Sequence, residues 1–408
     1  MDYKKIGKAL RKTRGNKSLK DIAEQSGLAV MTISNIERGI SVKEDTYRKV
    51  LNVYGYNYDS VFLAEENIKK TILQIVDGLL FVKNDLALDK YNELCKFNNE
   101  VLLPVHSLEI KFVSLLIEML ISKKTEFTKE KIDYMDHHLE DLSIKELKDY
   151  VLIVIEKQKL EYSEHTYYPE KLINIISNGE YNNSLLGLSC IPIADYYSKS
   201  GLYYDASKYL IKAEENFALD KNENRLLTCR LSIANLCTNC FDFRTAEKIY
   251  LSILSKNQID ERITKIVKQN LGWAYYLDEN YEKTMNLFTD SKVNNLSGDA
   301  LFLLMWSLYI TDRGKMLVNF LEKNKGVILS SDNIILNAFV DYVENKQSAD
   351  IEFKLLKYLD KVKEDNDRQN IIAIYRILIN YYENIGEFKL ANNYNKFLVQ
   401  EFFYGFTH

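Results

Sequence analysis

Two short segments of the chain place metal-ligating residue types close together. Cys237 and Cys240 have the CxxC spacing of zinc and redox sites, but neither a second such pair nor a pair of histidines follows them. Residues 136–141 contain two histidines and three carboxylic acids. Adjacent residues of a helix face different directions, and no partner motif occurs elsewhere. We therefore expect the cysteines to be packing residues, with no metal site and no cofactor.

Signatures of common catalytic centres are missing from the sequence. It contains no phosphate-binding glycine loop and no nucleophile elbow, so we expect no enzyme. Five cysteines, an odd number scattered along the chain, indicate a reducing compartment. The longest apolar stretch, 301–310, is much shorter than the roughly 20 residues that cross a bilayer. Without an apolar signal-peptide core at the N-terminus, we expect a cytoplasmic protein that does not enter a membrane.

Basic residues are concentrated at the N-terminal end. The 408-residue chain has a net charge of −4. Residues 2–49, however, contain twelve basic and six acidic residues, so this end carries +6 and the remainder −10. Such an asymmetry predicts a polyanionic partner for the N-terminal end alone.

Four short helices are predicted within this basic end, at about 3–14, 18–26, 28–39 and 44–54. Ser18 can cap the second helix, with Asp21 as its capping-box partner. Gly27 follows where a tight turn between helices requires a positive φ. In the third helix, two isoleucines three residues apart turn inward and leave the intervening side chains exposed, as a recognition helix requires.

This pattern resembles the helix-turn-helix of the Xre, Cro and phage-repressor family. The residues that carry the resemblance are Leu19, Ile22, Ala23, Gly27, Ile33, Ile36, Glu37 and Gly39. One departure is Ala29, where the family often has a capping serine or threonine. Glu37 is expected to pair inside the domain, with Arg11 or Arg14.

The resemblance implies that the third helix enters the major groove of double-stranded DNA. The residues expected to reach base edges are Val30, Met31, Thr32 and Asn35. Because Asn35 can bind adenine and the apolar side chains can contact thymine methyl groups, we expect an A/T-rich half-site. Phosphate contacts are expected from Lys17, Lys20, Arg38 and Lys43. A single helix-turn-helix domain makes too few base contacts for useful specificity. We therefore expect a homodimer that binds a palindromic operator.

The rest of the chain has helical periodicity and a recurring unit. With 3 prolines and 15 glycines it lacks the turns of a many-stranded protein, so we expect an all-α fold. Aromatic residues recur around a small residue at steps of 34 to 40 positions, as in a degenerate tetratricopeptide repeat. The equivalent positions are taken as Ala206, Ala246, Thr284, Val318, Phe353 and Ala391. The expected architecture is a right-handed tetratricopeptide-like α-solenoid.

Asparagines on the first helices of these repeats could hold a peptide in the concave groove. A carboxamide both donates and accepts, so stacked asparagines can bind an extended backbone without regard to its side chains. The principal candidates are Asn235, Asn239 and Asn270. Weaker candidates are Arg230, Trp273, Tyr276 and Asn380. For each single asparagine, an ordinary solvated polar residue is an equally good interpretation.

A helix-turn-helix head of residues 1–65 followed by repeats over residues 66–408 resembles the RRNPP family of peptide-responsive regulators (Rgg, NprR, PlcR and PrgX types). That resemblance implies dimerisation through the repeats and a short signalling oligopeptide that controls DNA binding, as in quorum sensing or communication between phages. The alternative is a DNA-binding regulator or scaffold whose repeats bind a protein partner without any peptide signal. An interaction protein without DNA binding would leave the basic head unexplained.

Overall fold

The computed structural model of the chain contains helices and turns and no strand in the part that it describes. The described residues are 3–40, 42–97, 106–122, 128–162, 168–178, 181–256, 260–345, 348, 350–364 and 367–403. The prediction of an all-α protein is confirmed. Among the described helices, none combines the length and the apolar character needed to cross a membrane.

The chain divides into two compact units. The first contains residues 1–192 and 216–225, and the second contains residues 193–215 and 226–408. The first unit therefore combines the basic head with the helices that follow it. The second contains most of the predicted repeats.

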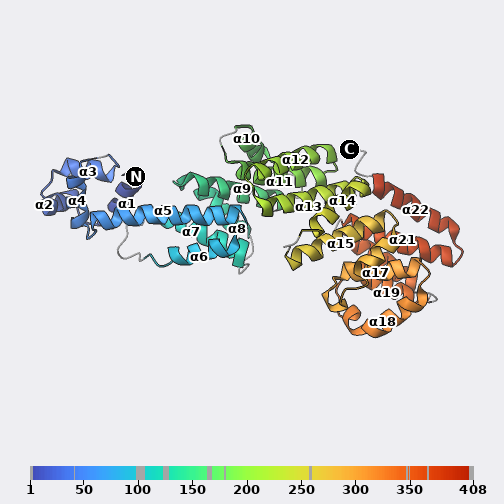
Figure 1. Cartoon of the computed structure of the whole chain (residues 1–408). Helices are drawn as coiled ribbons and strands as arrows, with labels where there is room; N and C mark the ends of the chain where they lie inside the picture. Colours follow the sequence, from blue (N-terminus) through green and yellow to red (C-terminus); the bar gives the residue numbers. More distant parts are fainter. Residues whose placement is uncertain are drawn as a thin grey trace. The chain divides into compact units, whose positions relative to one another are not determined.

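Four helices form the head, as predicted: α1 (Tyr3–Arg14), α2 (Leu19–Ser26), α3 (Val30–Glu37) and α4 (Glu44–Val53) (Figure 1). Their apolar faces enclose a core of their own. Both hydrogen bonds of the Ser18–Asp21 capping box are present, at 2.7 and 3.1 Å. Gly27 adopts the left-handed conformation with φ 68°, which lets the chain turn directly from α2 into α3.

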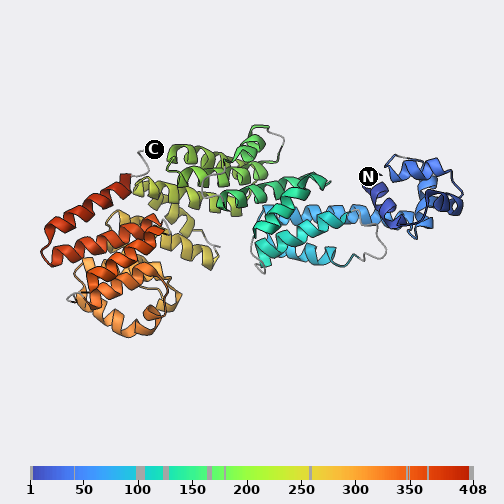
Figure 2. The same ribbon diagram turned by 180° about the vertical axis from the view of Figure 1, so that it is seen from behind.

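A 23-residue helix, α5 (Tyr58–Leu80), continues from the head. It contains the boundary predicted at residue 65: Val61 packs in the core of the head, while Ile72 and Ile75 are buried farther along the helix. The helices that begin between residues 84 and 192 are α6 (Asn84–Leu94), α7 (Ser107–Leu116) with its π-helical extension Ile117–Ser122, α8 (Lys129–His138), α9 (Lys145–Tyr162), α10 (Glu170–Asn178) and α11 (Asn183–Lys199). Figure 2 shows α5 from behind, beside α6.

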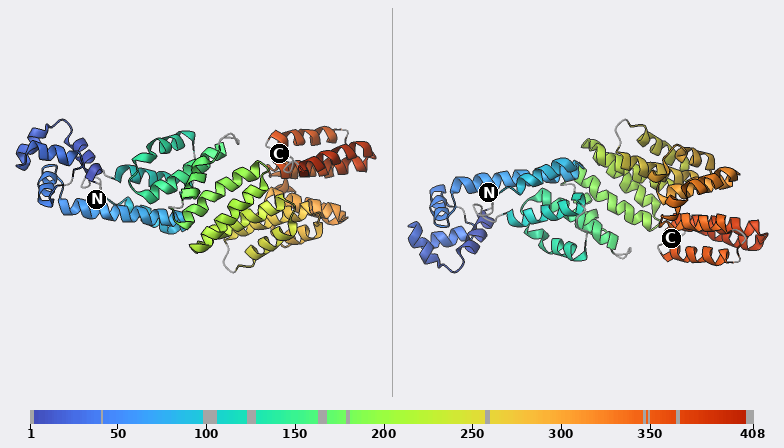
Figure 3. Two further views of the ribbon diagram at one scale, coloured as in Figure 1. Left: turned by 90° about the horizontal axis from the view of Figure 1, so that it is seen from above. Right: turned by 90° about the horizontal axis from the view of Figure 1, so that it is seen from below.

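Paired helices build the second unit, and α21 and α22 illustrate the packing of such a pair (Figure 3). The helices after α11 are α12 (Tyr203–Leu219), α13 (Glu223–Asn239), α14 (Phe243–Leu254), α15 (Glu261–Leu277), α16 (Tyr281–Phe288), α17 (Gly298–Ile310), α18 (Gly314–Leu329), α19 (Ile334–Glu344), α20 (Ile351–Glu364), α21 (Arg368–Asn384) and α22 (Phe388–Phe403). The second unit contains them except for residues 216–225. Odd-numbered helices are the first members of the pairs and even-numbered helices the second.

Four of the six predicted repeat positions have the same place in the structure. Ala206, Ala246, Thr284 and Ala391 are each the fourth residue of a second helix and are buried. Val318 and Phe353 were assigned wrongly, because their side chains are 51% and 73% exposed. The nearby residues Leu317 and Leu355 are the ones that are buried in α18 and α20. In α18 the error is one residue, and a shift of one residue turns a side chain by about 100° around a helix.

Candidate nucleic-acid interface and ligand groove

The outer face of α3 presents the side chains that were predicted to reach bases. Ile33 and Ile36 are fully buried and fasten the inner face to the head. Val30 and Met31, at the start of the helix, are 44% and 68% exposed. Exposed apolar residues at the N-terminal end of such a helix suit contact with thymine methyl groups in the major groove.

The polar residues predicted for DNA contact are available for binding. Within the described residues, no side chain forms a hydrogen bond or ion pair with those of Thr32, Asn35, Arg38, Lys17, Lys20 or Lys43. The four basic residues are exposed, and Thr32 and Asn35 are half-buried. All six side chains can therefore exchange water for a base or a phosphate without first breaking a contact of the head.

Glu37 fixes the end of α3 to the rest of the head. Of the two arginines predicted as its partner, Arg14 is the one: Nε donates to Glu37 Oε1 over 2.7 Å and Nη2 to Oε2 over 3.3 Å. Tyr54 also donates its hydroxyl hydrogen to Oε1, over 2.9 Å. The hydrogen bond to Glu37 raises the pKa of Arg14, while burial and the same carboxylate raise the pKa of Tyr54. Both groups therefore hold the recognition helix at neutral pH.

In the second unit, two of the predicted asparagines are in direct contact. Asn235 lies on α13 and Asn270 on α15, the next first helix. Asn270 Nδ2 donates to Asn235 Oδ1 over 2.8 Å, and the Tyr250 hydroxyl donates to the same oxygen over 2.7 Å. Tyr250, on α14, was not predicted as part of this cluster. It stands at a recurrent aromatic position of the repeat, and with an exposed fraction of 1% its ring also packs in the core.

This contact leaves the amide nitrogen of Asn235 and the amide oxygen of Asn270 unused. Asn235 Nδ2 and Asn270 Oδ1 form no hydrogen bond with another described residue, and both side chains are half-buried. A peptide unit offers one carbonyl acceptor and one N–H donor. The two carboxamides can therefore pair with an extended peptide while they keep their own hydrogen bond.

The remaining groove candidates lie in different environments. Asn239 is half-buried near the end of α13, and Arg230 is held by Glu214 over 2.8 Å. Trp273 and Tyr276 were wrong as ligand contacts: they are 2% and 0% exposed and belong to the core of the second unit. They follow Asn270 on α15 by three and six residues. Their side chains face α17, where both contact the ring of Phe302.

Asn380 belongs to a second polar cluster. Its Oδ1 accepts hydrogen bonds from Tyr309, Tyr342 and Asn384, over 2.8, 2.7 and 2.9 Å. These residues come from the C-terminal ends of α17, α19 and α21, all of them first helices. The two tyrosines were not predicted as part of a polar cluster, although their spacing of 33 residues is close to the repeat length and was a usable signal.

Arg376 joins first helices that are not neighbours. This buried residue of α21 donates from Nη1 to the carbonyl oxygen of Tyr276, near the end of α15, over 2.6 Å, and its guanidinium lies 4.6 Å from the centre of the Tyr276 ring. Between these two helices, side chains of α17 and α19 fill the same core. Buried side chains therefore fill the space between α15 and α21. The contact of Asn235, Tyr250 and Asn270, called the Asn235 cluster below, is the better candidate for a ligand site.

Comparison with known proteins agrees with both parts of this description. Residues 8–61 match the helix-turn-helix family. The chain carries a helix-turn-helix domain. Its fold is similar to that of the apo form of the quorum sensor NprR from B. thuringiensis, with TM-score 0.57, 16% identity, and coverage of 83% of this chain and 99% of that one. The predicted likeness to NprR-type proteins is thus confirmed for the fold.

A second solved structure, aspartyl phosphate phosphatase F from Bacillus subtilis, is also similar, with TM-score 0.50 and 14% identity over 82% of this chain and 93% of that one. No curated protein matches the chain in sequence. Both structural matches are below 25% identity, and they show a shared fold.

Cys237, Cys240 and the 136–141 segment, which contain metal-ligating residue types, have contacts within the fold. Burial raises the pKa of Cys237 to about 11 and also raises that of Cys240, so both thiols stay protonated at neutral pH. Asp136 pairs with Lys159 over 2.8 Å, and His138 lies 3.3 Å from Asp141. In the described part of the chain, no three metal-ligating residues are grouped to hold an ion.

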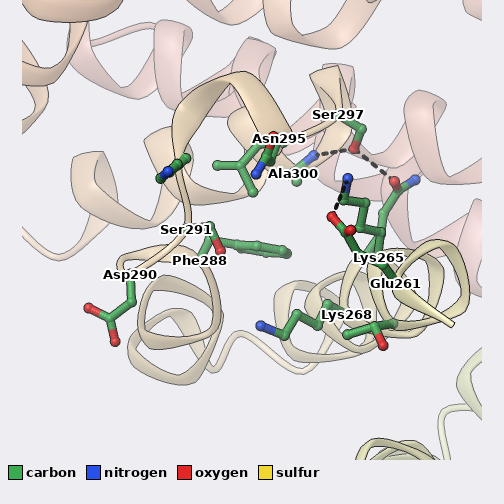
Figure 4. Close-up of a pocket in the computed structure, with 13 residues that line it drawn as sticks. Glu261, Lys265, Lys268, Phe288, Asp290, Ser291, Asn295, Ser297 and Ala300 are labelled. Atoms are coloured by element: carbon green, nitrogen blue, oxygen red, sulfur yellow. Dashed lines mark hydrogen bonds and ion pairs between the residues drawn. The ribbon is translucent and has the colours of Figure 1, made fainter. Parts of the chain in front are cut away.

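A pocket of about 470 Å³ lies beside α15 and is lined by Lys265 and Lys268 of that helix, but not by Asn270 (Figure 4). Gln269 faces it, accepting a hydrogen bond from Ser297 over 2.7 Å and donating to Asp299 over 2.8 Å. Phe288 also lines the pocket. Consecutive residues of a helix point in different directions, so Gln269 and Asn270 have different surroundings.

Proposed function

We propose that the chain is a DNA-binding transcription regulator controlled by a short signalling peptide bound at the Asn235 cluster. The observation that carries this proposal is that two features occur in one chain. The first is an exposed recognition helix, and the second is a pair of asparagines on adjacent first helices whose free amide nitrogen and amide oxygen can bind a peptide. The similarity to a quorum sensor supports the same function. The protein would act in the cytoplasm, as a regulator and not as an enzyme.

In this proposal α3 lies in the major groove. Asn35 donates to and accepts from adenine, while Val30 and Met31 contact thymine methyl groups, which favours an A/T-rich half-site. The basic residues around the helix bind phosphates and set affinity and register. A homodimer would place two heads on a palindromic operator.

The peptide would bind as an extended segment across α13 and α15. Its carbonyl group accepts from Asn235 Nδ2, and its N–H group donates to Asn270 Oδ1. Each such bond contributes only about 0.5–1.5 kcal/mol net, so apolar contacts must add affinity. Ile266 supplies one, because it lies one turn before Asn270 on α15 and is 40% exposed. Asn239, one turn after Asn235 on α13, would extend the polar row.

Titration calorimetry of the full chain with a library of short synthetic peptides, followed by operator binding with and without each binder, tests the peptide signal. A peptide that binds wild type, fails to bind the Asn270→Ala variant and changes operator affinity would support the proposal. Asn286→Ala, an exposed asparagine of a second helix, is the matched control. A peptide that binds both variants alike would overturn the assignment of the site.

The alternative function, repeats that bind a protein partner without a peptide, draws support from the fold shared with a phosphatase. The two functions differ in what co-purifies from the native host. A protein captured by wild type and lost with changes on the repeats, together with no response to any peptide, would favour the alternative.

A further inference from the structure

A buried carboxylate of the first unit contacts the DNA-binding head. Glu109 on α7 has no exposed surface. Its Oε1 accepts from the backbone N–H of Ser143 over 3.1 Å and from the Ser143 hydroxyl over 2.7 Å. It also forms an ion pair with Lys5 of α1, a residue 104 positions earlier in the sequence. The head is thus joined to α7 through a charge that water does not reach.

The first turns of α1 are packed just as tightly against the end of the recognition helix. A Cβ atom on Gly7 would lie 2.5 Å from the carbonyl oxygen of Ile36 and 2.7 Å from that of Glu37. A Cβ atom on Gly39, which has φ 81°, would lie 2.5 Å from Cα of Lys4. Because neither contact leaves room for adjustment, α1 and the end of α3 must move together. Lys5 lies between these two contacts in the sequence.

We propose that Glu109 is a positioning residue for DNA binding: through Lys5 and α1, it holds the recognition helix in one orientation on α7. This inference rests on the proposed DNA binding. Glu109 itself touches no DNA in this arrangement. It restricts the directions in which α3 can point, and so the geometry in which two heads can meet two half-sites.

The surroundings of Glu109 make Lys5 hard to replace. His106 lies beside it, with Nδ1 3.8 Å from Glu109 Oε2 and Nε2 4.0 Å from Glu65 Oε1. Neither ring nitrogen, nor Glu109 Oε2, has a hydrogen-bond partner in the structure as described. Lys5 is therefore the cation that holds this carboxylate, and without it Glu109 keeps only the two bonds from Ser143.

A cavity at the same place gives α1 room to move once the pair is broken. It has a volume of about 510 Å³ and is lined by Tyr3, Lys4, Gly39, Glu65, Lys69, His106, Ser143 and Ile144. Residues of α1 and the residue after the recognition helix thus form one wall, and residues near Glu109 form another. Loss of the ion pair would allow the head to tilt into this space.

The test uses the full chain with Glu109→Gln, Lys5→Met and the double variant. Glu109→Gln keeps the shape of the side chain, and Lys5→Met keeps the alkyl stem. The first measurement is hydrogen exchange without DNA, where both variants should lose protection in α1. Glu93→Gln is the matched control, since Glu93 forms an ion pair with Lys90 on the surface of α6. Lys5→Arg should restore protection, because it keeps the charge.

The second measurement compares DNA that carries one half-site with DNA that carries two. A hydrogen bond to a charged group contributes about 1.5–3 kcal/mol, so each single variant should bind the two-site DNA about tenfold more weakly or worse. The double variant should be no weaker than the singles, and binding to one half-site should change little. A purely structural loss of the head would weaken both DNAs alike, which would overturn the proposal.

The two measurements separate this inference from the proposed function. If wild type binds no DNA, the proposed function fails. Hydrogen exchange of the α1 amides in the variants still reports whether Glu109 holds the head. If wild type binds the two-site DNA and Glu109→Gln binds it equally well with α1 still protected, the positioning role is wrong while DNA binding stands.

Discussion

Asn270 Nδ2 donates to Asn235 Oδ1 over 2.8 Å, although the two asparagines lie 35 residues apart on separate first helices. One carboxamide orients the other, and the Tyr250 hydroxyl orients both by donating to the shared oxygen. The open donor and acceptor therefore keep a fixed direction before any ligand binds. Such preorganisation reduces the entropy lost on binding.

The first prediction separates ligand binding from DNA binding. Asn235→Ala and Asn270→Ala, singly and together, should abolish the response to the peptide and leave operator binding without peptide intact, because neither residue belongs to the head. Electrophoretic mobility shifts with and without peptide measure both properties. Loss of peptide-free DNA binding in the double variant would show that these residues are structural.

The second prediction concerns stability at the same cluster. Asn235→Ala removes the acceptor of the buried Tyr250 hydroxyl, which then keeps only a longer contact of 3.4 Å with Thr238. An unsatisfied buried polar group costs about 1–3 kcal/mol, so the urea midpoint should fall by a corresponding amount. In the Asn235→Ala, Tyr250→Phe double variant, part of this loss should return. A double variant with a still lower midpoint would contradict the prediction.

The third prediction concerns base specificity. A good bidentate contact discriminates against the wrong base by about 1–3 kcal/mol, so Asn35→Ala should relax selection at one A·T position of each half-site. Selection from random DNA measures this directly, with Asn52→Ala on the exposed side of α4 as the control. Half-sites rich in G·C from the wild type would refute the predicted A/T preference.

The fourth prediction is a pH dependence of stability. Burial alone would raise the pKa of Glu109, but its interactions with His106, Lys5 and Ser143 outweigh burial and hold the pKa well below the ordinary 4.5. A carboxyl group with a lowered folded-state pKa stabilises the fold fully above its unfolded pKa, and that contribution falls as the pH drops from about 4.5 toward the folded value.

Urea titrations of wild type and Glu109→Gln at a series of pH values test this sign. The difference in stability between the two proteins should be constant near neutral pH and shrink as the pH falls below about 4.5. A difference that grows on acidification would show that the folded pKa of Glu109 is raised instead.

The fifth prediction concerns the hydrogen bond that joins α21 to α15. Arg376→Met should destabilise the second unit, because the carbonyl oxygen of Tyr276 loses a charged donor. The expected loss is about 1.5–3 kcal/mol. Arg313→Met, which breaks a more exposed pair with Glu282, should cost less than about 1 kcal/mol. Equal losses measured by urea unfolding would show that the buried contact has no special role.

The amino-acid sequence by itself determined the helices of the head. The Ser18 capping box, the turn at Gly27 and the inward face of Ile33 and Ile36 depend on residues within one or two helical turns of each other, and local patterns of that kind can be predicted. The same reasoning placed Asn235 and Asn270 on neighbouring first helices, because one repeat separates them.

Only the tertiary structure decided which side chains meet across longer distances. The burial of Trp273 and Tyr276, the Tyr309 contact with Asn380 and the ion pair between Lys5 and Glu109 depend on how successive helices are rotated and stacked. A rotation error of one residue, as at Val318, turns a buried position into an exposed one. Contacts between distant segments add many such rotations together, so they follow from the packing of whole helices and not from the spacing of residues along the chain.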